Sequence, residues 1–196
     1  MARCSTQSVR ERLLAAGLTT FSKSGFNGCS VQDITDCAGV PKGSFYNHFE
    51  SKEALGVATL ERFWSKDSND QLHTLTRLDL SPLQRLRRYF GDIASEMASN
   101  EFTCGCLAAN MAAELSDHSP TISAKLSVIF AGWSRRVADC IRDAQQTGEI
   151  RIGADPDLLA AFVLNAWEGA LLRTRIEKSA RPLEQFIDVL FTHFLH

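Results

Sequence analysis

The sequence predicts an all-α protein of about nine helices. Apolar residues recur at helical spacing along the whole chain of 196 residues, and no alternating apolar and polar run lies between turn residues. Capping residues and prolines stand where helices should begin, and glycines stand where they should end. A chain of this length with 44% hydrophobic residues can bury a sizeable core.

The first helix is predicted to begin after Ser8 and to run for about four turns. Ser8 and Glu11 have capping-box spacing, and Gly25 lies just past the end. The residues between them place an apolar face on one side of the helix, made of Val9, Leu13, Leu14, Gly17, Leu18 and Phe21.

The next segment predicts two short helices separated by a tight turn. Ser30 and Asp33 repeat the capping pattern and open a helix that stops at Gly39. Pro41 then lies in the first turn of a third helix, whose inward residues at i and i+4 are Phe45 and Phe49. This is helix-turn-helix spacing. A fourth helix begins at Ser51, with an apolar side formed by Leu55, Ala58 and Phe63.

Five further helices are predicted in the rest of the chain. Residues 65–71 have no clear apolar face, so we expect two domains, residues 1–64 and 65–196. Helix starts are indicated by Ser81 with Pro82, by Gly105, by Ser119 with Pro120, by Asp155 with Pro156, and by Pro182. The most regular apolar stripe consists of Ile122, Leu126, Ile129, Phe130, Trp133, Val137, Ile141 and Ala144.

Composition argues for a cytoplasmic protein without a membrane span. The N-terminal residues do not resemble a signal peptide, and no stretch approaches the length of a transmembrane helix. Six cysteines without a secretory signal are expected to be reduced thiols. The net charge of −2 is unlike the basic balance of many nucleic-acid-binding proteins, so a DNA-binding face would have to be local.

The third predicted helix carries side chains that suit a DNA groove. If Phe45 and Phe49 face the core, the other faces present a charge, a hydroxyl, a phenol and an amide, from Lys42, Ser44, Tyr46 and Asn47. Gly43 lets the backbone approach DNA closely, and Lys52 lies where a phosphate could meet a helix N-terminus. Ordinary solvated residues on a small helix would have the same spacing, so the pattern alone leaves both interpretations open.

Residues 39–49, Gly-Val-Pro-Lys-Gly-Ser-Phe-Tyr-Asn-His-Phe, followed by Ser-Lys-Glu-Ala-Leu at 51–55, resemble the DNA-binding signature of the TetR family of bacterial repressors. The resemblance covers about residues 9–60. It implies a three-helix DNA-binding domain, a helical domain that dimerises and binds a small ligand, and release of operator DNA when that ligand binds. The positions that match DNA contacts of the family are Ser30, Gln32, Lys42, Gly43, Ser44, Tyr46, Asn47, His48 and Lys52.

The second half should then supply a dimer interface and a pocket for an inducer. Apolar surfaces on the last two helices predict the interface, at Leu159, Phe162, Val163, Ala166, Ala170, Phe186, Leu190 and Phe194. Burial within one protomer would explain each of these residues equally well. The predicted pocket residues are Phe90, Met97, Cys106, Asn110, Met111, Glu114, Trp133, Trp167 and Arg175.

Cys106 has three interpretations. At the start of a helix, a thiol feels the positive end of the helix dipole, which favours a reactive thiolate, and a buried packing residue is the alternative. The Gly-Cys-Leu at 105–107 resembles a TetR subgroup that includes sensors of electrophiles and oxidants. A metal site would use Cys104, Cys106 and His118, but no second ligand pair appears.

An enzyme with Cys106 as nucleophile is the rival class of function. The five histidines lie at no recognisable motif spacing from Cys106, and the chain has no Gly-rich phosphate loop. We therefore expect a non-enzymatic regulator with no cofactor and no bound metal.

Overall fold

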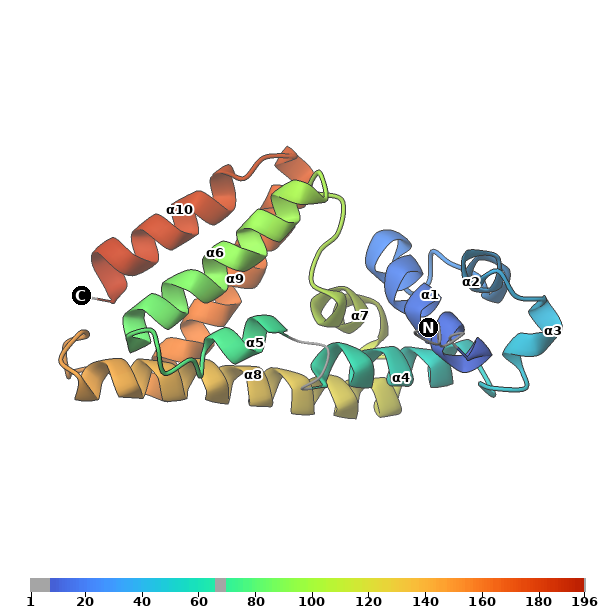
Figure 1. The fold of residues 1–196 in the computed structure, drawn as a ribbon, viewed down its shortest axis with the longest axis horizontal. Coiled ribbons are helices and arrows are strands. Elements are labelled where there is room, and N and C mark those ends of the chain that lie inside the picture. The colour runs from blue at the N-terminus through green and yellow to red at the C-terminus, as the bar shows by residue number, and fades with distance from the viewer. Residues whose placement is uncertain (1–7, 66–69, 196) are drawn as a thin grey trace, which may run out of the picture. The chain divides into compact units, whose positions relative to one another are not determined.

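The computed structural model describes residues 8–65 and 70–195, and these residues form ten α-helices, a π-helical segment and no strand (Figure 1). The all-α prediction is confirmed. The described residues divide into two compact units. The first unit contains the residues up to Trp64 together with Leu107–Leu126, and the second contains Ser65–Cys106 and the chain from Ser127 onward.

The first unit is built around α1 (Val9–Ser24), which packs against α2 (Val31–Ala38), α4 (Lys52–Trp64) and α7 (Leu107–Leu115). The short α3 (Lys42–Phe45) follows α2, and the first residues of α8 (Pro120–Gln146) complete the unit. Helices α1 and α4 approach closely at Gly17, where a Cβ atom would lie 2.9 Å from the Thr59 side chain. The core includes the fully buried Leu13, Phe21, Ile34, Phe45, Leu55, Leu60, Met111 and Ile122.

The second unit contains α5 (Asp70–Thr74), α6 (Pro82–Ser99), most of α8, α9 (Pro156–Glu177), α10 (Arg181–Val189) and the π-helical segment Leu190–Phe194. Three aromatic rings from α6, α9 and α10 meet in its core. The ring centroids of Phe90 and Trp167 are 4.9 Å apart, those of Trp167 and Phe186 are 5.1 Å apart, and those of Phe90 and Phe186 are 5.3 Å apart. These contacts tie α6, α9 and α10 together.

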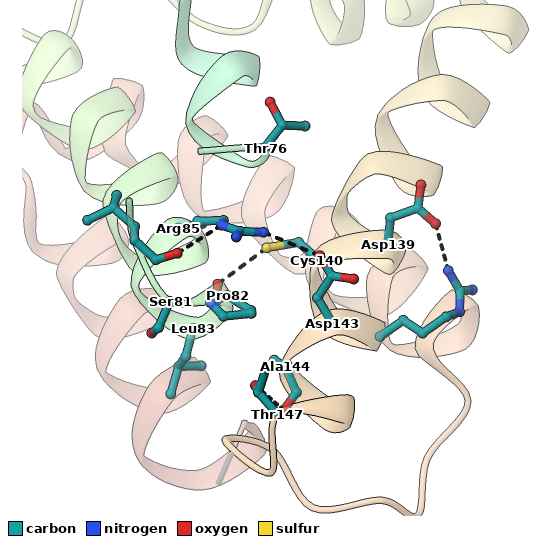
Figure 2. A network of polar contacts seen from close by, with 12 residues as sticks. Thr76, Ser81, Pro82, Leu83, Arg85, Asp139, Cys140, Asp143, Ala144 and Thr147 are labelled. Carbon is teal, nitrogen blue, oxygen red and sulfur yellow. Dashed lines mark hydrogen bonds and ion pairs between the residues drawn. The ribbon is translucent and has the colours of Figure 1, made fainter. Parts of the chain in front are cut away.

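Polar contacts fasten α8 to the start of α6 (Figure 2). Arg85, a buried arginine, donates to the Leu80 carbonyl at 3.1 Å and pairs with Asp143 of α8 at 3.3 Å. The Cys140 thiol donates to the Pro82 carbonyl at 3.3 Å, and burial raises the pKa of that thiol to about 12. Cys140 is therefore a packing residue that stays protonated at physiological pH.

Two elements differ from the helices expected. Helix α5 begins at the end of the stretch that lacked an apolar face and was not expected; Leu72 within it and Leu75 just after it are 2% and 3% exposed. Helix α3 is four residues long; Pro41 takes the N-cap position rather than the first turn, and Phe49 lies beyond the helix end. Among the described residues, no helix is long and apolar enough to cross a membrane.

Candidate nucleic-acid interface

The start of α2 is fixed by a complete capping box. The Asp33 N–H donates to Ser30 Oγ at 3.2 Å, and both the N–H and the hydroxyl of Ser30 donate to Asp33 Oδ2 at 2.7 Å. These bonds hold the pKa of Asp33 below its ordinary value, so its carboxylate stays charged. Gln32 is exposed beside them and donates its amide to Asp36 at 2.7 Å.

The end of α2 is held by a residue that the sequence did not single out. Gly39 adopts a left-handed conformation with φ of 63°, which ends the helix. Arg12 of α1 donates to the Ala38 carbonyl from Nε at 3.0 Å and from Nη2 at 2.7 Å, and to the Gly39 carbonyl at 2.7 Å. A Cβ atom at Gly39 would lie 2.9 Å from this guanidinium. The turn is therefore fixed to α1 as well as to α2.

Helix α3 and the turn after it separate apolar from polar side chains. Phe45 is fully buried and Phe49 is 5% exposed, and their ring centroids are 5.9 Å apart. The Tyr46 ring meets Phe45 edge-on at 5.3 Å, while its side chain is 58% exposed. The neighbouring polar residues Lys42, Asn47 and His48 are also exposed, and Ser44 is half-buried. Gly43 has open space where a Cβ would stand.

Lys52 is held inside the first unit. Its ammonium donates to the carbonyls of Phe26 and Cys29, both at 2.9 Å, and lies 4.4 Å from the centre of the Phe26 ring. The side chain is half-buried. An ammonium group has three N–H donors, and two of them are used within the chain.

The structure places the nine residues matched to DNA contacts within the first unit, on α2, α3, the following turn and the start of α4. Eight of them are exposed or half-exposed without a tie to a distant part of the chain, and Lys52 has the structural role just described. Arg10, an exposed residue of α1, adds a cation 5.2 Å from the centre of the Phe49 ring. Arg10 lies before the family signature, and no sequence pattern marked it as a candidate DNA contact.

The second unit contains a polar cluster around Cys106. Glu168 of α9 accepts a hydrogen bond from the Cys106 thiol, and burial of the carboxyl raises its pKa to about 7. The Tyr89 hydroxyl of α6 has Cys106, Trp133 and Glu168 among its polar neighbours, and burial raises the pKa of Tyr89. Cys106 is itself half-buried and directly precedes α7.

Among the described residues of the second unit, four buried side-chain atoms have no hydrogen-bond partner at normal geometry: Trp133 Nε1, Trp167 Nε1, Glu168 Oε1 and Thr174 Oγ1. Buried polar groups in native proteins are usually satisfied, and exceptions often mark a place where another molecule binds. Glu168 and Thr174 were not predicted from the sequence. Glu168 did carry a signal, because it is the one acidic residue between Asp157 and Glu177.

The residues predicted to line a ligand pocket fall into both units. Phe90, Met97, Trp133 and Trp167 are buried in the second unit, where Cys106 and Arg175 are half-buried. The first unit contains the other three, Asn110, Met111 and Glu114. Both carboxylate oxygens of Glu114 accept backbone N–H groups within that unit. Among the described residues, no group of three metal-ligating side chains is placed to hold a metal ion.

A groove with a volume of about 430 Å³ lies between α9 and the helices that end the chain. Seven of the eight residues predicted at a dimer interface line it, and Leu159 does not. Phe162 and Phe194 stack across it with ring centroids 5.2 Å apart, although they are 51% and 45% exposed. Lining residues that were not predicted are Gly169, Arg173, Pro182, Gln185 and Val189.

Comparison with known proteins gives matches over nearly the whole chain. Residues 13–59 match the family model of bacterial regulatory proteins of the tetR family, and residues 82–190 match the model of the tetracyclin repressor-like C-terminal domain. The HTH-type transcriptional repressor DhaR of Mycobacterium sp. strain GP1 is 42% identical over 187 residues, which cover 95% of this chain and 92% of DhaR.

Two solved structures share the fold. The regulatory protein TetR from Rhodobacter sphaeroides has 33% sequence identity and a TM-score of 0.90, with 95% of this chain and 99% of that chain covered. The reduced form of Escherichia coli NemR has 28% identity and a TM-score of 0.82, with 95% and 96% covered. The chain therefore belongs to the tetR family of bacterial regulatory proteins, and it is a transcriptional regulator that binds DNA.

Proposed function

We propose that the protein is a dimeric repressor that reads operator DNA with α2 and α3 and leaves it when a small molecule binds the second unit. Its role is binding in the cytoplasm, where bacterial operators lie, and no catalytic step is assigned to it. The observation that carries the proposal is the separation of side chains in α3 and the turn after it: Phe45 and Phe49 are buried while Lys42, Tyr46, Asn47 and His48 are exposed.

The proposed division of labour follows from the chemistry of the exposed groups. Lys42 and Ser44 would read base edges, helped by Gln32 and by the close backbone approach at Gly43, because donors and hydroxyls distinguish bases in the major groove. The phosphate contacts would come from Ser30, Tyr46, Asn47, His48 and Lys52. The overall charge of −2 predicts weak binding to non-operator DNA.

Replacing Lys42 with alanine is expected to weaken operator binding by about 5- to 150-fold, because one base contact contributes about 1–3 kcal/mol of discrimination. Because Lys42 is exposed, we expect the substitution to lower the free energy of unfolding by no more than about 0.5 kcal/mol. The measurement is a mobility-shift titration on the DNA that flanks the protein's own coding region, at fixed salt concentration.

Arg151→Ala is the matched control, since it removes an exposed cation from the second unit. The operator affinity of this control should equal that of the wild type. Both variants should unfold at the wild-type temperature. An unchanged affinity in Lys42→Ala would remove Lys42 from the interface. Absence of a shift for the wild type at every salt concentration would contradict the proposed function itself.

We also assign the dimer interface to the groove beside α9. A two-fold axis brings the same patch of both protomers together, and this patch offers exposed Phe162, Val189 and Phe194 with Arg173 as its one charged lining residue. The relatives and the family match support a dimeric regulator. Two heads in one dimer would meet successive major grooves about 34–36 Å apart.

The inducer site is proposed among the unsatisfied atoms of the second unit. Two indole N–H donors, from Trp133 and Trp167, and the free oxygen of Glu168 would bond the polar groups of a small organic ligand. Phe90 and Met97 are buried in the same unit and would supply apolar contact. A difference of about 1–3 kcal/mol in operator affinity between the free and ligand-bound protein would suffice for release.

A thiol-switched repressor is the second candidate, favoured by the hydrogen bond between Cys106 and Glu168. When Glu168 is ionised, its carboxylate can act as a general base and take the thiol proton as the sulfur attacks. With an electrophile such as N-ethylmaleimide, the sulfur would bond to one alkene carbon, and the proton leaving the thiol would end on the neighbouring carbon. The solved structure of the NemR relative is that of its reduced form.

N-ethylmaleimide is expected to weaken operator binding at least about fivefold through Cys106. Because Cys37 is an exposed thiol on α2 itself, its alkylation could block DNA directly. The experiment therefore uses a background with Cys4, Cys37 and Cys104 replaced by serine, and compares it with the same background carrying Cys106→Ser. Loss of the shift in the first protein alone is the expected result; equal loss in both would exclude the thiol switch and leave a non-covalent inducer.

A further inference from the structure

The loop that precedes α2 is gripped by a carboxylate from α7. Glu114 accepts the Phe26 N–H through Oε1 at 3.0 Å and the Asn27 N–H through Oε2 at 2.6 Å. Both bonds join residues that are more than 80 positions apart in the sequence, and both lie within the first unit. Hydrogen bonds to a charged acceptor are stronger than those between neutral groups, so this carboxylate fixes the two peptide groups firmly.

The same loop is held from a second helix by a charge of opposite sign. Lys52 of α4 donates to the carbonyls of Phe26 and Cys29 at 2.9 Å. Glu114 thus accepts two N–H groups of the loop, and Lys52 donates to two of its carbonyls. Phe26 is bonded to both side chains. Four backbone polar groups of the loop, the N–H groups of Phe26 and Asn27 and the carbonyls of Phe26 and Cys29, are therefore bonded by side chains from α7 and α4, so the position of the loop depends on these two residues.

Gly25 makes the approach of Glu114 possible. Its φ is 76°, a conformation that favours glycine. A Cβ atom at Gly25 would lie 2.3 Å from Glu114 Oε1, inside the carboxylate. Glycine is therefore needed at this position both for the backbone conformation and for the close approach of the Glu114 carboxylate.

The loop leads directly into the DNA-reading helices. Ser30, the N-cap of α2, follows the Lys52-bound Cys29, and Gln32 lies in the first turn of α2. We infer that Glu114 is a positioning residue for operator binding: it acts through the loop 25–29 to set the place of Ser30 and Gln32 against DNA. This inference rests on the proposed function, and it gives Glu114 a role other than contact with an inducer.

The test compares full-length Glu114→Gln with the wild type. Glutamine keeps one acceptor oxygen but presents an NH2 group to the second backbone donor, so the loop should lose one bond and gain a repulsion. Operator affinity should fall by about tenfold, and the amides of residues 26–32 should exchange hydrogen for deuterium faster. The dependence of affinity on salt concentration should stay unchanged, because Ser30 and Gln32 are uncharged and no lysine or arginine is removed.

Glu149→Gln is the matched control. In the second unit, Glu149 accepts the Leu83 N–H at 2.8 Å, so the substitution breaks a carboxylate–backbone bond of the same kind away from the reading helices. Its operator affinity should equal that of the wild type. Stoichiometric titration gives the active fraction of every preparation, since a variant that merely folds less completely would lower that fraction without changing the dissociation constant.

An unchanged operator dissociation constant in Glu114→Gln, or a lowered active fraction alone, would overturn the inference while leaving the proposed function intact. Failure of the wild type to bind the operator would overturn both. In that case hydrogen exchange would still show whether Glu114 fixes the loop.

Discussion

Replacing Phe162 with glutamate is expected to weaken dimerisation by at least about 100-fold. Phe162 stacks on Phe194 in the groove beside α9 and is 51% exposed in the protomer, so a partner surface would bury it further. In a two-fold interface every substitution occurs twice, and each buried, unpaired carboxylate costs several kcal/mol. A truncated interface hot spot alone costs about 2 kcal/mol or more.

Sedimentation equilibrium measures the dimer directly, and operator binding by the variant should fall because a monomer presents one head. The matched control is Leu78→Glu, which adds the same charge at a leucine that is 91% exposed and outside the groove. A dimeric Phe162→Glu protein with wild-type affinity would show that the groove is not the interface.

The Glu168→Gln variant is expected to remove a loss of folding stability that the wild type suffers as pH rises. Burial raises the pKa of Glu168 from its ordinary value of 4.5 to about 7. Between these pH values the unfolded chain releases its proton while the folded protein retains it, so the free energy of unfolding falls as pH rises and levels off above about pH 7. At about 1.4 kcal/mol per pKa unit, the loss reaches up to about 3 kcal/mol. Glutamine does not titrate and removes this loss.

Denaturant or thermal unfolding between pH 4 and 8 tests this expectation, and the slope with pH is the informative quantity. The difference in stability between Glu168→Gln and wild type should grow in favour of the variant up to about pH 7. Glu184→Gln, at an exposed carboxyl of α10, should follow the wild-type profile. Parallel profiles for Glu168→Gln and wild type would mean that Glu168 ionises normally in the folded protein.

Local signals in the sequence predicted the parts of the fold that depend on neighbouring residues. The capping box at Ser30 and Asp33, the left-handed end of α2 at Gly39 and the inward direction of Phe45 are present as expected. Each depends on residues within a few positions, so the sequence contains the necessary information. Helix α5 escaped prediction because two leucines, Leu72 and Leu75, anchor it without a full apolar face.

Contacts across the chain were harder to predict. Arg12 reaches Ala38 and Glu114 reaches Phe26, and in both cases a long side chain satisfies backbone groups of a distant segment. No periodicity marks such a partner. The pocket prediction, which grouped Met111 and Glu114 with Phe90 by residue type, stays a prediction; the structure assigns Met111 and Glu114 to the first unit and Phe90 to the second. Assignment of a helix to a unit depends on packing, which spacing along the sequence does not contain.

The three bonds from Arg12 to the carbonyls of Ala38 and Gly39 have a consequence for how operator preference can change over generations. They and the buried Phe45 hold the backbone of the turn without help from the exposed side chains of α3. Substitutions at Lys42 and other exposed reading positions should therefore alter stability by only about 0.5 kcal/mol. The scaffold can stay constant while the sequence that it recognises drifts, which allows duplicated copies of such a gene to acquire separate operators.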